Sequence, residues 1–308
     1  MDRRAFLSLA AAALIAAPWR ERAVAAPPVL IGDDICRSPR ALPIVVASTG
    51  AGDLSYQGTH ILAYGVMKDL APAFGATGRG RLAVAGGGCD DGIAGIKRQL
   101  ADFGGMCCPV KGSAAEKYPY LLVGHDMKAV VAHGTNPVAG LSFAQLKAIA
   151  RGKLLDWKDL GGEARPIAQV VRKHCPDYVE PVRAALLGNR DEWSGKALFV
   201  DTDEQIVDMV SRFPAALGVV SWVFARPLVE AGKLSLLALD GLRPDRARAR
   251  YPLTGPLSLI FRQWQPARMT PFFDFLYGEQ GRAIVARDLI PVTAAQAGYR
   301  GSATFGRA

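Results

Sequence analysis

Short apolar runs that lead into glycine and then into a helical pattern dominate the hydrophobic pattern of the chain. The runs "ALPIVVAST" (41–49) and "RLAVAGGG" (81–88) are typical of buried strands. The segments 61–74 and 91–101, which come later, carry apolar residues at helical spacing. Strand, glycine-rich turn and helix N-terminus together form the βα unit of a parallel sheet. The pattern therefore predicts an α/β protein.

The same alternation continues toward the C-terminus. Further strands are expected at 127–134, 167–171, 216–225 and 255–263, and further helices at 142–152, 177–188 and 269–288. Ser142 with Gln145 three residues later predicts a capping box at a helix start. Doubly wound sheets bind ligands at the carboxyl ends of their strands, so the strand-to-helix loops are where function is expected.

The N-terminus has the pattern of an export signal. Arg3 and Arg4 precede an apolar run at 7–17 and a small-residue pattern at 23–25. This pattern resembles a twin-arginine signal, with residues 1–25 removed on export. The run is shorter than the ~20 residues that span a bilayer. We expect a periplasmic chain with no membrane span after processing; a one-helix anchor is the alternative.

The composition of the chain limits the classes of function that it can have. The chain has 308 residues, of which 50% are hydrophobic and 21% charged, and this is enough for two domains. Its net charge of +9 is dispersed, without a basic block or an aromatic platform, which argues against nucleic-acid binding. No nucleophile elbow, Walker loop or His-Glu-x-x-His motif is present, so we expect no enzymatic activity. A thiol enzyme built on Cys175 and His174 is an alternative.

The cysteines suggest a binding chemistry. There are five, an odd number that cannot all pair within one chain. Either two disulfides leave one spare thiol, or one disulfide leaves three thiols. The candidate loops hold Cys89 in "GGGCDDGI", Cys107 and Cys108 in "ADFGGMCCP", and Cys175 in "VRKHCPDY".

These loops, together with "NPVAGLSFAQLKAIARGKLLDWKDLGG" and "GVVSWVFA", resemble the periplasmic phosphate-binding proteins of ABC transporters over about residues 45–290. The resemblance implies a type II-like binding protein with two lobes, each a doubly wound mixed sheet. It places lobe 1 at 26–125 plus 250–308 and lobe 2 at 126–249. Two crossing segments, near 122–128 and 248–255, would join the lobes, and ligand would be enclosed by hinge closure.

The resemblance also implies the ligand positions. Cys89 stands where the family has a serine in its "GGGSGxGI" loop, and Asp90 follows it. Cys108 takes the last position of the family's short Ala-Ser-Asp stretch. Of the family's "GRxxGSGT" loop, Arg172 is retained and the Ser and Thr are lost. Cys175, which follows His174, occupies the neighbouring glycine position. His60, after Gly58 and Thr59, is the best match to the first loop.

These replacements disfavour phosphate, which needs many hydrogen-bond donors and is repelled by carboxylates. Soft sulfur ligands instead suit Cu(I), Zn(II) or trivalent arsenic. We expect arsenite to bind through Cys89, Cys108 and Cys175, with no other cofactor. In extended backbone only one of Cys107 and Cys108 can face the ligand, and the resemblance selects Cys108. Cys107 would then point away and be free to pair with Cys36. Three roles are open for His174: donation to the ligand, lowering of the pKa of a neighbouring thiol, or simple exposure. Asp90 serves either the ligand or the helix N-terminus.

Within the family, the cysteine placement and export signal resemble the periplasmic arsenite-binding proteins that report to a sensor histidine kinase. The expected function is therefore arsenite sensing, with arsenite and the kinase's periplasmic domain as partners. Two alternatives remain. One is a phosphate-binding or other oxyanion-binding component of an ABC transporter, and the other is a copper or zinc carrier.

Overall fold

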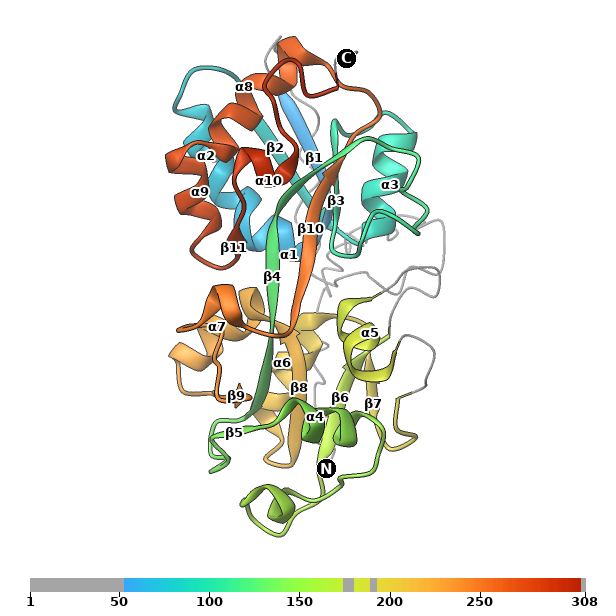
Figure 1. Ribbon diagram of the computed structural model, residues 1–308, viewed down its shortest axis with the longest axis vertical. Coiled ribbons are helices and arrows are strands. Elements are labelled where there is room, and N and C mark those ends of the chain that lie inside the picture. The colour runs from blue at the N-terminus through green and yellow to red at the C-terminus, as the bar shows by residue number, and fades with distance from the viewer. Residues whose placement is uncertain (1–52, 174–179, 189–192, 306–308) are drawn as a thin grey trace, which may run out of the picture. The chain divides into compact units, whose positions relative to one another are not determined.

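The structure, a computed structural model, describes residues 53–173, 180–188 and 193–305 (Figure 1). Two separate hydrophobic cores define two lobes. The first core draws on residues from 54–123 and 257–299, with Val223 added, and the second on residues from 127–253. The predicted leader 1–25, the expected strand 41–49, Cys36, His174 and Cys175 lie outside the described residues.

The first lobe is built on a mixed sheet with the strand order β2-β1-β3-β10-β4. β1 (Leu54–Thr59), β2 (Leu82–Gly87) and β3 (Phe103–Met106) are parallel, and β10 (Thr254–Ile260) runs antiparallel to β3. Figure 1 shows α2, α8 and α9 on one side of these strands and α3 on the other. The helical elements are α1 (His60–Leu62), η1 (Ala63–Met67), α2 (Lys68–Gly75), α3 (Cys89–Lys97), α8 (Pro266–Tyr277), α9 (Glu279–Val285) and α10 (Ala294–Ala297).

The second lobe has its own mixed sheet. β8 (Ala216–Ser221) and β6 (Ala168–Arg172) are parallel, β7 (Leu198–Val200) continues parallel to β6, and β9 (Leu234–Leu239) pairs with β5 (Gly140–Leu141). Its helical elements are α4 (Phe143–Ala150), η2 (Trp157–Leu160), α5 (Pro181–Leu187), α6 (Asp203–Arg212), α7 (Trp222–Glu230) and η3 (Arg248–Arg250). Each lobe thus combines a β-sheet with helices, which confirms the predicted α/β class.

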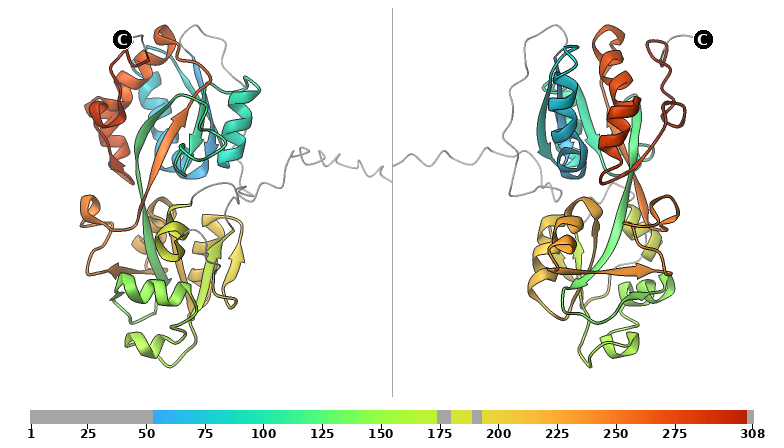
Figure 2. Two further views of the ribbon diagram at one scale, coloured as in Figure 1. Left: turned by 45° about the vertical axis from the view of Figure 1, so that its right-hand side comes forward. Right: turned by 90° about the vertical axis from the view of Figure 1, so that its left-hand side faces the viewer.

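One long strand belongs to both sheets. β4 (Tyr120–His133) pairs with β10 as far as Met127 and with β8 from Lys128 onward. The short β11 (Ile290–Pro291) also pairs with β4. Figure 2 shows β4 and β10 side by side where the chain passes between the lobes. The expected crossings at 122–128 and 248–255 fall on this part of β4 and on η3 and the start of β10. Tyr251 and Leu253 pack in the second core, beyond the residue 249 at which lobe 2 was expected to end.

Local chemistry explains where elements begin and end. The predicted capping box is present: the Gln145 amide donates to Ser142 Oγ (3.1 Å), and the Ser142 amide donates to Gln145 Oε1 (2.7 Å). The strand expected over 216–225 is wrong beyond Ser221. There Ser221 Oγ accepts from the Val223 amide (3.3 Å) and starts α7. An apolar run alone does not separate a buried strand from a buried helix.

The long helix expected over 269–288 is interrupted. α8 ends at Tyr277, and Gly278, with an extended backbone at ψ 175°, separates it from α9. Among the helices in the described ranges, none is long and apolar enough to cross a membrane.

Candidate functional site

Cys89 is the first residue of α3, directly after β2 and the turn glycines. The Gly88 amide donates to Asp91 Oδ2 (2.8 Å), so the Asp91 carboxylate satisfies an N–H at the helix start. Asp90 lies half-buried in the same first turn. The Cys89 side chain is fully buried. The turn into α3 therefore fixes the thiol at the carboxyl edge of the sheet.

Cys107 and Cys108 follow β3 without a gap. β3 pairs with β1, and the two backbones approach so closely that a Cβ on Gly58 would lie 2.3 Å from the Gly105 amide nitrogen. Gly58 also has φ +149°, a conformation that L side chains rarely adopt. Since β2 also pairs with β1, the carboxyl ends of β2 and β3 meet at one edge of the sheet.

The three described cysteines form one buried cluster. The Sγ atoms of Cys89 and Cys107 are 3.3 Å apart, and the Cys107 amide donates to Cys89 Sγ (3.2 Å). The sulfurs of Cys89, Cys107 and Cys108 all lie within 4.8 Å of one another. The three cysteines are free thiols. Cys107 thus lies in the cluster, and the expectation that it points away is wrong. β3 ends at Met106, so strand alternation does not extend to Cys107.

The cluster sets the order in which its thiols ionise. Hydrogen bonds from Cys108 and Cys89, helped by the positive charges of Arg172 and Lys128, hold the pKa of Cys107 well below its ordinary value. Hydrogen bonding to Cys107 raises the pKa of both Cys89 and Cys108, and burial adds to this. Cys107 therefore ionises before Cys89 and Cys108.

A small cavity of about 20 Å³ connects the cluster to the second lobe. Its wall includes Cys89, Cys107 and His60 from the first lobe, and Arg172 and Glu204 from the second. Further residues that line it are Thr59, Ile61, Gly87, Gly88, Thr202, Asp203 and Phe224. Cys108 and Asp90 are not among the lining residues. The structure thus brings the predicted Cys89, Arg172 and His60 to one cavity.

His60 joins the lobes directly. It is buried, and its Nδ1 lies 3.3 Å from Glu204 Oε1. Its ring makes an edge-to-face contact with Tyr64, with the ring centroids 5.5 Å apart. The loop at 58–60 therefore contributes to the cavity through the imidazole of His60. Glu204, from the second lobe, holds this ring in place.

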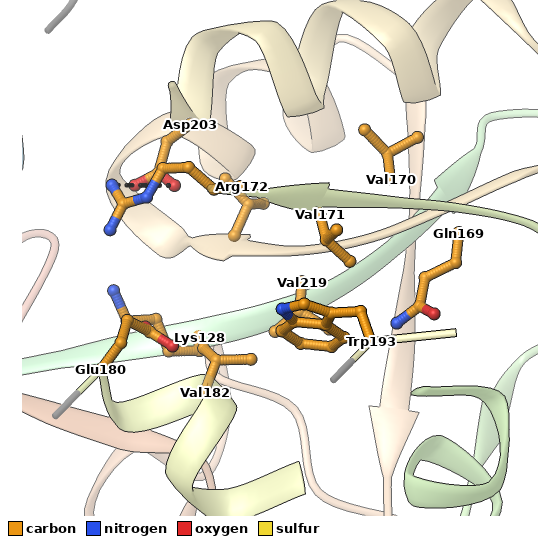
Figure 3. Close-up of a pocket in the computed structure, with 11 residues that line it drawn as sticks. Lys128, Gln169, Val170, Val171, Arg172, Glu180, Val182, Trp193, Asp203 and Val219 are labelled. Atoms are coloured by element: carbon orange, nitrogen blue, oxygen red, sulfur yellow. Dashed lines mark ion pairs between the residues drawn. The ribbon is translucent and has the colours of Figure 1, made fainter. Parts of the chain in front are cut away.

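Arg172, at the end of β6, faces Asp203 in the first turn of α6. Its Nη1 lies 3.5 Å from Asp203 Oδ1, and Figure 3 shows this ion pair above the amine of Lys128 and the carboxylate of Glu180. Arg172 and Asp203 line both the interlobe cavity and a second cavity inside lobe 2. The ion pair therefore separates the two spaces, with charged groups concentrated at the boundary.

A buried ion pair lies where β4 changes partners. Lys128 Nζ is 2.7 Å from Asp126 Oδ2, and Ser221 Oγ donates to Asp126 Oδ1 (2.8 Å). Burial works against the Lys128 charge, but attraction to Asp126 and then to Asp203 raises its pKa overall. The ammonium therefore remains charged beside the cysteine cluster.

Sequence reasoning missed several of these residues. Asp203 and Glu204 follow Thr202, whose Oγ1 accepts from the Gln205 amide (3.2 Å) in a capping box. The pattern Thr-x-x-Gln was visible in the sequence and could have marked this helix start. Asp126 and Lys128 carry no such signal, because an ion pair buried inside a strand has no local motif.

The fold and the cavity define a two-lobed binding protein whose candidate ligand site lies between the lobes. The chain matches the model of the PBP superfamily domain over residues 47–280, and it belongs to this family. The phosphate-binding protein PstS of Bacillus subtilis (strain 168) is 27% identical over 192 residues, which cover 56% of this chain and 58% of that protein. The aligned part thus spans less than two thirds of this relative.

Solved structures show the same fold. A putative phosphate ABC transporter substrate-binding protein from Clostridium perfringens, with bound phosphate, superposes with a TM-score of 0.67 at 23% identity, over 78% of this chain and 100% of its own. An ABC-type phosphate transport receptor from Vibrio cholerae gives a TM-score of 0.54 at 20% identity, over 76% and 97%. At these identities the likeness concerns the fold alone.

Proposed function

We propose that this protein is an exported, periplasmic solute-binding protein that captures arsenite between its lobes. The observation that carries the proposal is the buried cluster of three free thiols, whose sulfurs lie within 4.8 Å of one another. Soft sulfur ligands select soft or borderline centres, trivalent arsenic among them. Because the cluster lies at the interlobe cavity, arsenite bound to these thiols would be enclosed between the two lobes.

The chemistry of arsenous acid fits the cluster. It is neutral near pH 7 and condenses with thiols; each As–S bond replaces an As–O bond and releases water. The low pKa of Cys107 supplies a thiolate to begin the reaction. A phosphate dianion would meet the carboxylates of Asp203 and Glu204 at the cavity wall. A like-charge contact of this kind costs about 4 kcal/mol at 4 Å with an effective dielectric constant of about 20.

The output we propose is signalling. Ligand that contacts both lobes stabilises the closed form by its preference for that form over the open one. The closed surface would then engage the periplasmic domain of a sensor histidine kinase. The twin-arginine-like N-terminal pattern and the resemblance of the cysteine loops to arsenite-binding sensor proteins support this assignment.

A second candidate is binding of phosphate or another oxyanion for an ABC transporter. The names of the relatives favour it, because both the Bacillus subtilis protein and the Clostridium perfringens structure are described as phosphate-binding. Arg172 at the cavity wall is a residue type that suits an oxyanion. In this alternative the cysteines would be structural.

The two candidates are separated by titrating the reduced, processed protein with arsenite and, separately, with inorganic phosphate. Tryptophan fluorescence reports binding, and a free-thiol assay at saturation reports how many sulfurs react. Loss of thiols with arsenite and no response to phosphate would support arsenite capture. A phosphate response with every thiol still free would favour transport, and zinc or copper retained after purification would favour the carrier.

A matched pair of variants tests the cluster itself. Cys89→Ser should weaken arsenite binding at least tenfold, because it removes one sulfur and leaves the shape of the site intact. Ser211→Ala is the control: Ser211 is half-buried near the end of α6 and does not line the cavity, so this change should leave binding unchanged. Unchanged arsenite affinity in Cys89→Ser would contradict the proposed site.

A further inference from the structure

Two buried polar atoms at the interlobe cavity have no hydrogen-bond partner within the described part of the chain. They are Nε2 of His60 and Oδ2 of Asp203. Both residues are only 6% exposed. One comes from each lobe, and both residues line the cavity that Cys89 and Cys107 also line. Buried polar groups are normally paired, so each orphan atom needs an explanation.

The surroundings of these atoms determine what they can accept. His60 Nδ1 lies 3.3 Å from Glu204 Oε1, and a carboxylate there favours the tautomer with its proton on Nδ1. Nε2 is then left as an acceptor. Asp203 Oδ1 faces the Arg172 guanidinium at 3.5 Å, which leaves Oδ2 as a second acceptor. Two acceptors at one cavity are complementary to a ligand that donates through O–H.

Resting on the proposed capture of arsenite, we propose that arsenic binds through two sulfurs only, those of Cys89 and Cys107, and retains one hydroxyl group. That hydroxyl group donates its one proton to Asp203 Oδ2, the acceptor of the second lobe, in the cavity that His60 also lines. The 3.3 Å separation of the two sulfurs suits bonding to one atom, and Cys108 does not line the cavity. The bound arsenic would thus contact both lobes, the first through its two As–S bonds and the second through its retained hydroxyl group.

The reaction balances without an oxidant. Arsenous acid, As(OH)3, reacts with two thiols to give a dithioarsenite with one As–OH and two molecules of water. Each As–S bond forms as an As–O bond breaks, and each departing hydroxide takes up a thiol proton. Arsenic remains trivalent throughout.

A hydroxyl-retaining site should discriminate between arsenite and methylarsonous acid. Methylarsonous acid can also bond to two sulfurs, but it then presents a methyl group where arsenite presents its hydroxyl. Methyl at this place leaves Asp203 Oδ2 unpaired, which disfavours binding. We expect the protein to bind arsenite about tenfold more tightly than methylarsonous acid.

The test combines thiol counting with one isosteric variant. At saturation with arsenite the reduced protein should lose two thiols per arsenic, and alkylation followed by peptide mass spectrometry should find Cys108 still reactive. Asp203→Asn places an N–H donor at the acceptor position. It should weaken arsenite binding about tenfold while changing methylarsonous acid binding less than about twofold. Asp201→Asn, whose side chain is 53% exposed, is the control and should change neither affinity.

The outcomes separate this inference from the function on which it rests. Loss of three thiols per arsenic, or an equal loss of affinity for both arsenicals in Asp203→Asn, would overturn the hydroxyl-retaining mode and leave arsenite capture standing. Binding of neither arsenical, with all thiols still free, would overturn the proposed function itself. The thiol count uses the unmodified protein, so it decides even if Asp203→Asn folds poorly.

Discussion

The sulfur atoms of Cys89 and Cys107 lie 3.3 Å apart although 18 residues separate them in the chain. Their strands, β2 and β3, are not neighbours; each pairs with β1, one on either side. Strands two places apart are separated by roughly 10 Å. The turn into α3 and the end of β3 close this gap, and the Cys107 amide, which donates to Cys89 Sγ, holds the two sulfurs together.

The ionisation order of the cluster predicts which cysteine reacts first. The pKa of Cys107 is lowered and that of Cys89 and Cys108 is raised, and only the thiolate is nucleophilic. Modification by methyl methanethiosulfonate should therefore begin at Cys107. Its rate should rise with pH and reach half its maximum below about pH 8.5, the ordinary thiol value. Peptide mass spectrometry across pH 5–9 measures this.

Cys107→Ser is the control for that experiment. It removes the early thiolate, so the remaining described thiols should react only at higher pH. The stability linked to a lowered pKa is present above the unfolded-state value and is lost as pH falls through the folded-state value. Wild type should therefore lose its advantage over Cys107→Ser toward acid pH. Early modification at Cys108 would contradict this order of ionisation.

The glycine contact between β1 and β3 predicts a second result. A Cβ at position 58 would lie 2.3 Å from the Gly105 amide nitrogen, at φ +149°. Gly58→Ala should lower the free energy of unfolding by about 2–3 kcal/mol, because backbone must move to make room. Gly75→Ala, where nothing lies within 4 Å of the added carbon, should be neutral or slightly stabilising. Urea denaturation compares the two, and equal stabilities would show that the strands can separate at no cost.

Much of the fold was predictable from the chain because it depends on local pattern. The glycine-rich turn after β2 placed Cys89 between a strand and a helix, although α3 begins at Cys89, two residues before its expected start at 91. The Ser142 capping box marked α4 correctly. The α/β class follows from repeated βα units, since each unit is written in consecutive residues. These predictions needed no knowledge of distant contacts.

The arrangement of the site was less predictable because it depends on where strands end and how the lobes meet. Alternation gave the wrong direction for Cys107, since β3 stops one residue before it. The acceptors His60 and Asp203 come together only through the contact of two lobes, and 143 residues separate them in the sequence. The predicted ligands His174 and Cys175, and the predicted disulfide partner Cys36, lie outside the described residues and stay predictions.

The last prediction concerns the buried ion pair that lies where β4 passes from one lobe to the other. Asp126 and Lys128 are 1% and 3% exposed, with Nζ and Oδ2 2.7 Å apart. Asp126→Ala leaves a buried ammonium without its nearest counter-charge and should cost about 3–5 kcal/mol of unfolding free energy. The double variant Asp126→Leu with Lys128→Met removes both charges and should recover most of that loss, because an apolar pair replaces an ion pair at little net cost in a buried site.

An exposed ion pair serves as the control for this prediction. Arg212 Nη2 and Asp208 Oδ1 are 2.9 Å apart on α6, with side chains 67% and 52% exposed. Asp208→Ala should change the unfolding free energy by less than about 1 kcal/mol, because water screens the pair. If Asp126→Ala were as mild as Asp208→Ala, the ammonium of Lys128 would have to reach water or another carboxylate. The Asp126–Lys128 pair would then not stabilise the junction between the two sheets.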